Sequence, residues 1–185
     1  VTVDNVSGGN WSFKTDDKIY PLNDRSVDIT DKTSLIPYQI KNLEVSNNKM
    51  SFLRFDIPSS ITNSHKIKLN LVVDGESTLN GGIAIHKYDQ LGWGENPDNK
   101  NIGIIDHSLG ATIATLTSQA NGTTVWDNGT AQSLDNGTTL SIDLTDKITS
   151  YGEEYSIAIR VLETTDKVTF FSKEKKMIDR AFSPH

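Results

Sequence analysis

The chain contains no cysteine, which excludes disulfide bonds and thiolate metal ligands and removes the usual clue to the redox compartment. It also has no run of about 18 consecutive apolar residues, so we expect no membrane-spanning helix. Positive charge is scarce: 18 Lys and Arg against 24 Asp and Glu give a net charge of −6. That balance argues against general nucleic-acid binding, whose affinity comes mostly from the neutralisation of phosphates.

What is present is typical of one soluble, β-rich domain. The 185 residues are 35% hydrophobic and 23% charged, which is enough to build a sizeable core. We expect residues 1–185 to form a single domain. No signal peptide is visible, and Val1 is not a native start, so we expect a segment excised from a longer secreted protein.

Eight segments alternate apolar and polar residues with the period of two that indicates half-buried strands. They cover residues 40–46, 50–57, 66–74, 83–88, 111–117, 139–144, 154–162 and 167–173. A short helix is expected near 145–151, where Thr145-Asp146 would cap its start and Gly152 would close its end in the left-handed conformation. The pattern predicts an all-β fold, an antiparallel two-sheet β-sandwich of jelly-roll-like type with this one short helix.

Several predicted strands carry a basic side chain in the row that faces away from the core. These side chains are Arg54, Lys68, His86 and Arg160. If the strands are neighbours, they form a cationic patch on one sheet face. Two alternatives stay open: Arg54 as the partner of a half-buried acid, because a buried arginine normally has one, and Arg160 as a solvated surface residue.

Catalytic motifs are missing from the sequence. Asp106-His107-Ser108 are adjacent and therefore cannot form the relay that a triad requires, and there is no G-x-S-x-G motif. We therefore predict no catalytic residues. Calcium is a different matter, because it needs only oxygen ligands, and Asp24, Asp28 and Asp31 could supply them to a structural Ca²⁺ site.

Sugar binding by stacking would require exposed aromatic rings. The candidate tryptophans are Trp11, Trp93 and Trp126. Each has an alternative in which the indole fills a corner of the sandwich, and for Trp93 that alternative is favoured.

Five stretches occur in an order that is characteristic of a known family. They are SFLRFDIPSSI (51–61), IKLNLVV (67–73), IAIHKYDQLGWGENP (83–97), LSIDLTDKITSYGEEYSIAI (140–159) and VTFFSKE (168–174). The set resembles the DNRLRE-type domain, which is grouped with a carbohydrate-binding module family known for alginate binding. The resemblance implies a non-catalytic β-sandwich in secreted polysaccharide-degrading enzymes and cell-surface proteins of bacteria and archaea. It also implies that basic side chains on a sheet face bind an acidic polysaccharide.

The expected function is therefore that of a non-catalytic carbohydrate-binding module, extracellular or at the cell surface, for alginate or another uronate-containing polysaccharide. The expected ligand-binding residues are Arg54, Lys68, His86, Lys87, Tyr88, Trp93 and Arg160. The expected partners are this polysaccharide and the parent multidomain enzyme or surface protein, with no nucleic acid, no membrane insertion and a monomeric state. Two alternatives are a structural or adhesion module without a sugar ligand, and a lyase or hydrolase that uses Tyr or His as base.

Overall fold

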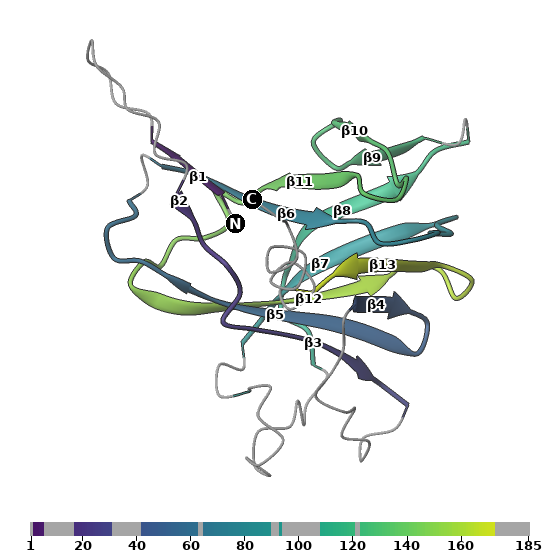
Figure 1. The fold of residues 1–185 in the computed structure, drawn as a ribbon, viewed down its shortest axis with the longest axis horizontal. Coiled ribbons are helices and arrows are strands. Elements are labelled where there is room, and N and C mark those ends of the chain that lie inside the picture. Colours follow the sequence, from purple (N-terminus) through teal and green to yellow (C-terminus); the bar gives the residue numbers. More distant parts are fainter. Residues whose placement is uncertain are drawn as a thin grey trace, which may run out of the picture.

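The computed structural model describes residues 2–5, 17–30, 42–62, 65–89, 93, 108–120 and 123–172, and the structural statements below concern these residues. Within them every element is a strand and every strand pairing is antiparallel (Figure 1). The larger, nine-stranded sheet curls into a half-barrel. Its strands, in spatial order, are β10 (Ala131–Gln132), β9 (Thr124–Trp126), β8 (Thr112–Ser118), β7 (Gly82–Tyr88), β12 (Glu153–Val161), β5 (Lys49–Ile57), β4 (Asn42–Ser46) and β13 (Lys167–Phe171), with β3 (Asn23–Asp28) paired to β5.

The smaller sheet is built around the long pair of β6 (His65–Val72) and β11 (Thr139–Asp143). The short strands β1 (Thr2–Asn5) and β2 (Asp17–Lys18) continue it beyond β6. Alternate residues of β6 and β11 are buried, and they pack into one core cluster with the alternate residues of β5, β12 and β7. The apolar rows of the two sheets therefore face each other across a common core.

The curl of the larger sheet begins where β4 leaves β5. The two strands share one residue pair, Ser46–Lys49. Beyond it the backbone N–H of Glu44 donates to Ser26 Oγ (2.7 Å), and the Glu44 carbonyl accepts from Ser51 Oγ (3.0 Å). These buried serine hydroxyls replace the missing ladder bonds, because a buried backbone polar group must be paired. On its other edge β4 pairs with β13, and an isolated bridge, Val73–Phe170, links β13 to the end of β6.

The outward face of the larger sheet carries a second apolar layer, which we call the outer cluster. Its members are Val27, Met50, Phe52, Tyr88, Trp93 and Ala158, all at most 8% exposed. Phe52 meets Tyr88 edge-on with ring centroids 4.8 Å apart, and Trp93 at 6.3 Å. Burial on both faces is the reason why β5 carries apolar side chains in both of its rows, with Met50 and Phe52 on one face and Leu53, Phe55 and Ile57 on the other.

The eight predicted strands are confirmed to within two residues at each end, as are the all-β class and the antiparallel pairing. The left-handed conformation of Gly152 is also confirmed, with φ at +76°. The helix predicted near 145–151 is wrong, because the described residues contain no helix. Five strands were not predicted: β1, β2, β3, β9 and β10.

The segment forms a turn because its polar groups find partners outside a helix. Thr145 donates its backbone N–H to Asp143 Oδ1 (2.9 Å), while its hydroxyl accepts from the backbone of Ile67 (3.0 Å). Leu144 accepts from both Lys147 and Ile148. Gly152 then donates to Ile57 instead of capping a helix. A single such turn cannot offset the cost of helix nucleation.

Candidate functional site

The basic residues predicted to bind a ligand do not form one patch. Arg54, His86 and Arg160 lie on the outward face of the larger sheet, on the adjacent strands β5, β7 and β12. Lys68 lies on β6 and faces outward from the smaller sheet, on the other side of the core. Lys87 follows Ile83 and Ile85 in their row of β7, away from His86, and pairs with Asp89 at 3.2 Å.

Arg54 and Arg160 are themselves well separated on their shared face. Arg54 is in register with Ser156, so Arg160 lies four residues further along β12. At a rise of about 3.3 Å per residue, that separation is about 13 Å. Phe52 and Ala158 of the outer cluster lie between them.

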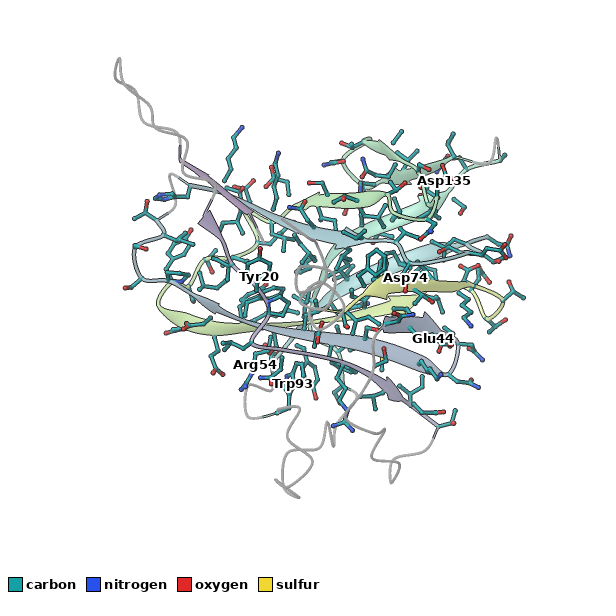
Figure 2. All side chains as sticks on the ribbon, viewed as in Figure 1. Tyr20, Glu44, Arg54, Asp74, Trp93 and Asp135 are labelled. Carbon is teal, nitrogen blue, oxygen red and sulfur yellow. The ribbon has the colours of Figure 1, made fainter. Side chains whose placement is uncertain are left out.

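Arg54 is held by side chains of the protein. Its Nη1 lies 3.2 Å from Glu154 Oε2, and its guanidinium carbon lies 5.9 Å from the centre of the Trp93 ring (Figure 2). With its amide oxygen turned toward Arg54, Asn23 also accepts from Nε at 3.0 Å. The alternative in which Arg54 is the partner of an acid is confirmed.

Tyr88 and Trp93 are 1% and 2% exposed, respectively, so neither ring offers a face on which a sugar could stack. The burial favoured for Trp93 is confirmed, but the indole lies in the outer cluster and does not fill a corner of the sandwich. Its Nε1 has no hydrogen-bond partner among the described residues. Both rings stabilise the outer cluster through edge-on contacts with Phe52.

His86 explains why an arginine stands at position 160. His86 Nε2 accepts a hydrogen bond from Arg160 Nε at 3.1 Å, and His86 Nδ1 faces the carbonyl of Gly110 at 3.2 Å. Burial lowers the pKa of His86, the hydrogen bond to Gly110 opposes this change, and the charge of Arg160 lowers the pKa further, so that it lies below the ordinary 6.5. The neutral ring is therefore the form that can accept from Arg160.

This geometry predicts a loss of stability on mild acidification. The unfolded chain binds the His86 proton more readily than the folded chain does, so the stability is complete above the unfolded pKa of 6.5. It is lost as the pH falls through the lower folded value. We expect the urea midpoint to fall between about pH 7.5 and about pH 5.5, and to fall less in His86→Gln, which retains an acceptor for Arg160. An equal fall of the urea midpoint with pH in both proteins would contradict this assignment.

Of the aspartates predicted to bind calcium, Asp24 and Asp28 are not brought together. Asp24 and Asp28 lie on the same strand, β3, four residues and about 13 Å apart. Asp28 Oδ1 accepts from the backbone and the hydroxyl of Thr30. Asp31 lies outside the described residues. In the described ranges, no group of three or more metal-binding side chains is close enough to hold an ion, and no helix could cross a membrane.

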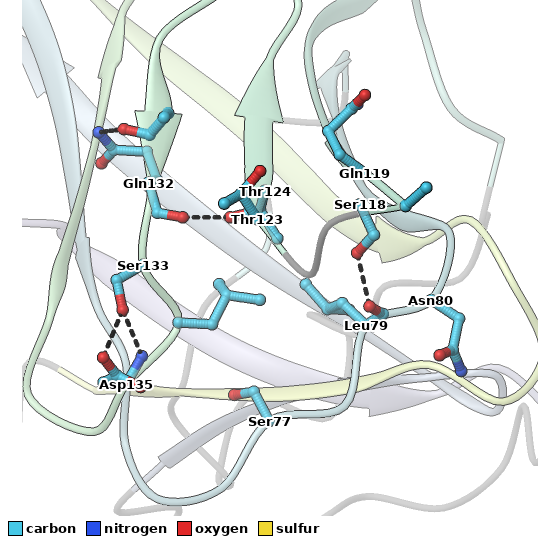
Figure 3. Close-up of a pocket in the computed structure, with 13 residues that line it drawn as sticks. Ser77, Leu79, Asn80, Ser118, Gln119, Thr123, Thr124, Gln132, Ser133 and Asp135 are labelled. Atoms are coloured by element: carbon cyan, nitrogen blue, oxygen red, sulfur yellow. Dashed lines mark hydrogen bonds between the residues drawn. The ribbon is translucent and has the colours of Figure 1, made fainter.

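A groove of about 830 Å³ lies beside the β9–β10 hairpin, and we call it the hairpin groove (Figure 3). Gln132, Ser133 and Asp135 lie on one side of it, across from Asn80, Ser118 and Gln119. The remaining lining residues are Ser77, Leu79, Ala120, Thr123, Thr124, Ala131 and Leu134. The groove lies far from Arg54 and Trp93, as the position of Asp135 shows (Figure 2).

Hydrogen bonds fix both walls of the groove. Ser118 Oγ donates to the Leu79 carbonyl at 2.5 Å, and the Thr124 hydroxyl donates to the Gln132 carbonyl. Ser133 Oγ donates to Asp135 Oδ2 at 2.6 Å. Gln132 Oε1 accepts from the backbone of Ser141 on β11, and thereby ties the hairpin to the smaller sheet. The groove therefore presents positioned hydroxyl and amide groups.

Asp135 is the one charged side chain among the described residues that line the groove. Neutral donors and acceptors with a few apolar contacts are suited to a polar, uncharged ligand that has many hydroxyl groups. Sequence reasoning missed these residues. The available signal is the density of Asn, Gln, Ser and Thr between positions 119 and 139.

No family model matches the chain, and no curated protein matches it.

Proposed function

We propose that the chain is a non-catalytic carbohydrate-binding module with a jelly-roll-like β-sandwich fold. The sandwich proposal is supported by the core that the two sheets share and by the curl at β4 that brings β13 beside β6. The observation that carries the function is the hairpin groove. It has the size of a small-molecule site, and its lining is rich in fixed hydroxyl and amide groups.

The charges favour a neutral polysaccharide in this groove over a uronate polymer. The groove contributes one carboxylate and, among its described residues, no cation. A polyanion would also approach a chain of net charge −6. On the outward face of the larger sheet, where binding of uronate was predicted, Arg54 is paired with Glu154 and Lys68 is absent. Arg160, which is exposed, remains the residue through which an acidic polymer would be recognised there.

Each hydrogen bond from an exposed site adds little affinity, because water competes for the same groups. Useful binding would come from several contacts along one polysaccharide chain and from attachment to a larger protein with its own sites. The module would then serve to hold a parent enzyme or surface protein on its polysaccharide.

Affinity electrophoresis in native gels that contain a neutral glucan, a xylan or alginate tests this proposal. We expect retardation by a neutral polymer, and at least about a threefold weaker retention in Gln119→Ala, which removes an exposed amide from the groove wall. Arg160→Ala is the matched control, because it removes an exposed side chain on another face. The neutral polymer should retard this variant, relative to a gel without polymer, as much as it retards the unmodified chain.

Three other outcomes would contradict parts of the proposal. Retardation by alginate that is lost in Arg160→Ala would move the site to the outward face of the larger sheet. Turnover of any polymer would replace the binding function by a catalytic one. An absence of retardation in every gel would favour a structural or adhesion module without its own sugar ligand.

A further inference from the structure

Three copies of Asn-Gly-Thr lie close together in the chain, at positions 121–123, 128–130 and 136–138. The structure describes the second and the third copy in full. Asn-Gly is a frequent turn dipeptide, because both residues tolerate the left-handed conformation. Asn-x-Thr is also the acceptor signal for N-linked glycans. A turn requires the Asn and the Gly but makes no demand on the residue after them, so the threonine distinguishes the two interpretations.

The second copy forms the turn of the β9–β10 hairpin. Gly129 donates its backbone N–H to the Trp126 carbonyl (2.8 Å) and has φ at +85°. Asn128 Oδ1 accepts from the backbone N–H of Thr130 (3.0 Å). The hydroxyl of Thr130 makes no hydrogen bond with any described residue. The turn therefore accounts for the Asn and the Gly and leaves the threonine side chain without a structural role.

The side chain of Asn128 is open to the attachment of a glycan. Residues 127–131 are all exposed. Its Oδ1 takes part in the turn, but its Nδ2 has no partner in the part of the chain that the structure describes. An N-linked glycan replaces one hydrogen of Nδ2 and keeps the amide oxygen. The folded hairpin can therefore carry the modification and retain the bond to Thr130.

A fourth Asn-Gly pair, Asn80-Gly81, has a structural role alone. Asn80 Nδ2 donates to Thr165 Oγ1 at 3.2 Å, and the backbone N–H of Gly81 donates to the carboxylate of Asp166. The next residue is Gly82, so no hydroxyl follows. Here the amide nitrogen is engaged and the acceptor signal is missing, in contrast to Asn128 on both counts.

The third copy is less accessible than the second. Asn136 Oδ1 accepts from the backbone N–H of Gly75 at 2.8 Å, which holds the turn before β11 against a neighbouring turn. Thr138 is half-buried, whereas Thr130 is exposed. Of the two copies that the structure describes, the one at Asn128 is thus the better acceptor.

We propose that Asn128 is the attachment site of an N-linked glycan. In the transfer step, Asn128 Nδ2 attacks the anomeric carbon of an oligosaccharide that is carried by a polyprenyl phosphate or diphosphate lipid. A bond forms between Nδ2 and this carbon, and the bond from the carbon to the phosphate oxygen breaks. The lipid phosphate leaves with the electron pair, and the transferase that catalyses the step takes one proton from Nδ2.

The glycan would lie at the tip of a hairpin whose second strand, β10, forms an edge of the larger sheet (Figure 1). Sheet edges present unpaired backbone groups to other chains, and a bulky, hydrophilic glycan would shield this one. The proposal requires the extracellular location that the sequence predicts. It does not depend on a ligand in the hairpin groove, whose lining excludes Asn128.

Peptide mass spectrometry of the full chain, isolated from the cells that produce it, tests the proposal. Cleavage on the N-terminal side of aspartate gives the peptides 106–126, 127–134 and 135–142, so each Asn-Gly-Thr copy lies in a peptide of its own. We expect the 127–134 peptide to carry the added mass of whole sugar residues, which fragment ions assign to Asn128. Its modified fraction should exceed that of the 135–142 peptide.

Two variants produced in the same cells test whether the modification follows the acceptor signal. Thr130→Ala should abolish it, because the signal requires a hydroxyl at this position. Thr130→Ser is the matched control and should retain it. Both variants keep Asn128, Gly129 and the backbone N–H of the turn, so the urea midpoint of the chain without glycan should stay the same in both.

A 127–134 peptide without added sugar would overturn the proposal, and so would a modification that persists in Thr130→Ala. Conversion of Asn128 to aspartate without sugar would show that the turn is deamidated and carries no glycan, which would also overturn it. These results are distinct from those for the hairpin groove, because retention by neutral polymers and its loss in Gln119→Ala are measured separately.

Discussion

Replacing Asp166 by alanine should lower the free energy of unfolding by about 3–5 kcal/mol, because three backbone N–H groups would lose one shared acceptor. Asp166 is 2% exposed and lies in the turn before β13. Its Oδ1 accepts from Asn80 N (2.6 Å), and its Oδ2 accepts from Gly81 N (3.0 Å) and Gly82 N (2.8 Å). One carboxylate thereby anchors the end of the connection that leads into β7.

The effect should reach the hairpin groove. Leu79 and Asn80 belong to one groove wall, and the carboxylate of Asp166 fixes the backbone on which they stand. Urea unfolding followed by tryptophan fluorescence measures the loss of stability. Asp166→Asn is the matched control, because it keeps the shape and one carbonyl acceptor, and it should lose less than the alanine variant. A loss below about 1 kcal/mol in Asp166→Ala would mean that water replaces the carboxylate.

Gly82→Ala should be comparably damaging, with a loss of about 3–5 kcal/mol from backbone strain and overpacking together. Gly82 has φ at +124°, a backbone conformation that residues with a Cβ atom rarely adopt. A Cβ there would overlap the carbonyl oxygen of Leu116 and lie 2.9 Å from Thr117 Cα. Because Gly82 pairs with Thr117, the methyl group would push β7 and β8 apart.

Gly75→Ala separates the two causes of this loss. Gly75 also has a positive φ, +82°, but a Cβ there would meet nothing within 4 Å. We expect it to lose about 1–2 kcal/mol, which is the cost of the left-handed conformation alone. The urea midpoints of both variants provide the comparison. We expect the dependence of the unfolding free energy on urea concentration to equal that of the unmodified chain. Equal losses in the two proteins would contradict the role assigned to the contact with Leu116.

The local fold could be predicted from the sequence because a strand with one buried face leaves a period of two in its residues. Ile67, Leu69 and Leu71 show that pattern, and β6 was predicted within two residues of its bounds. The outer cluster left a weaker signal. Met50 and Phe52 stand in the row of Arg54, and Tyr88 stands in the row of His86, and three large apolar side chains in these rows indicate a second buried layer.

The candidate site could not be predicted, because it depends on which strands are neighbours. Arg54, Lys68 and Arg160 have equivalent places in the sequence pattern. The structure puts Lys68 in the other sheet and pairs Arg54 with Glu154, one hundred residues away. The hairpin groove joins segments near positions 77–80, 118–124 and 131–135, and no local pattern relates them.

The sequence by itself determined the strands, their buried rows and the excess of negative charge, since each depends on residues that are close along the chain or on simple counts. The tertiary structure alone decided the order of the strands, the curl at β4 and the partners of the charged groups. The physical reason is that burial and charge pairing act between residues that are near in space. Arg160 illustrates this division. The alternation of polar and apolar residues around it predicts a strand, but its hydrogen bond to His86 depends on the pairing of β12 with β7.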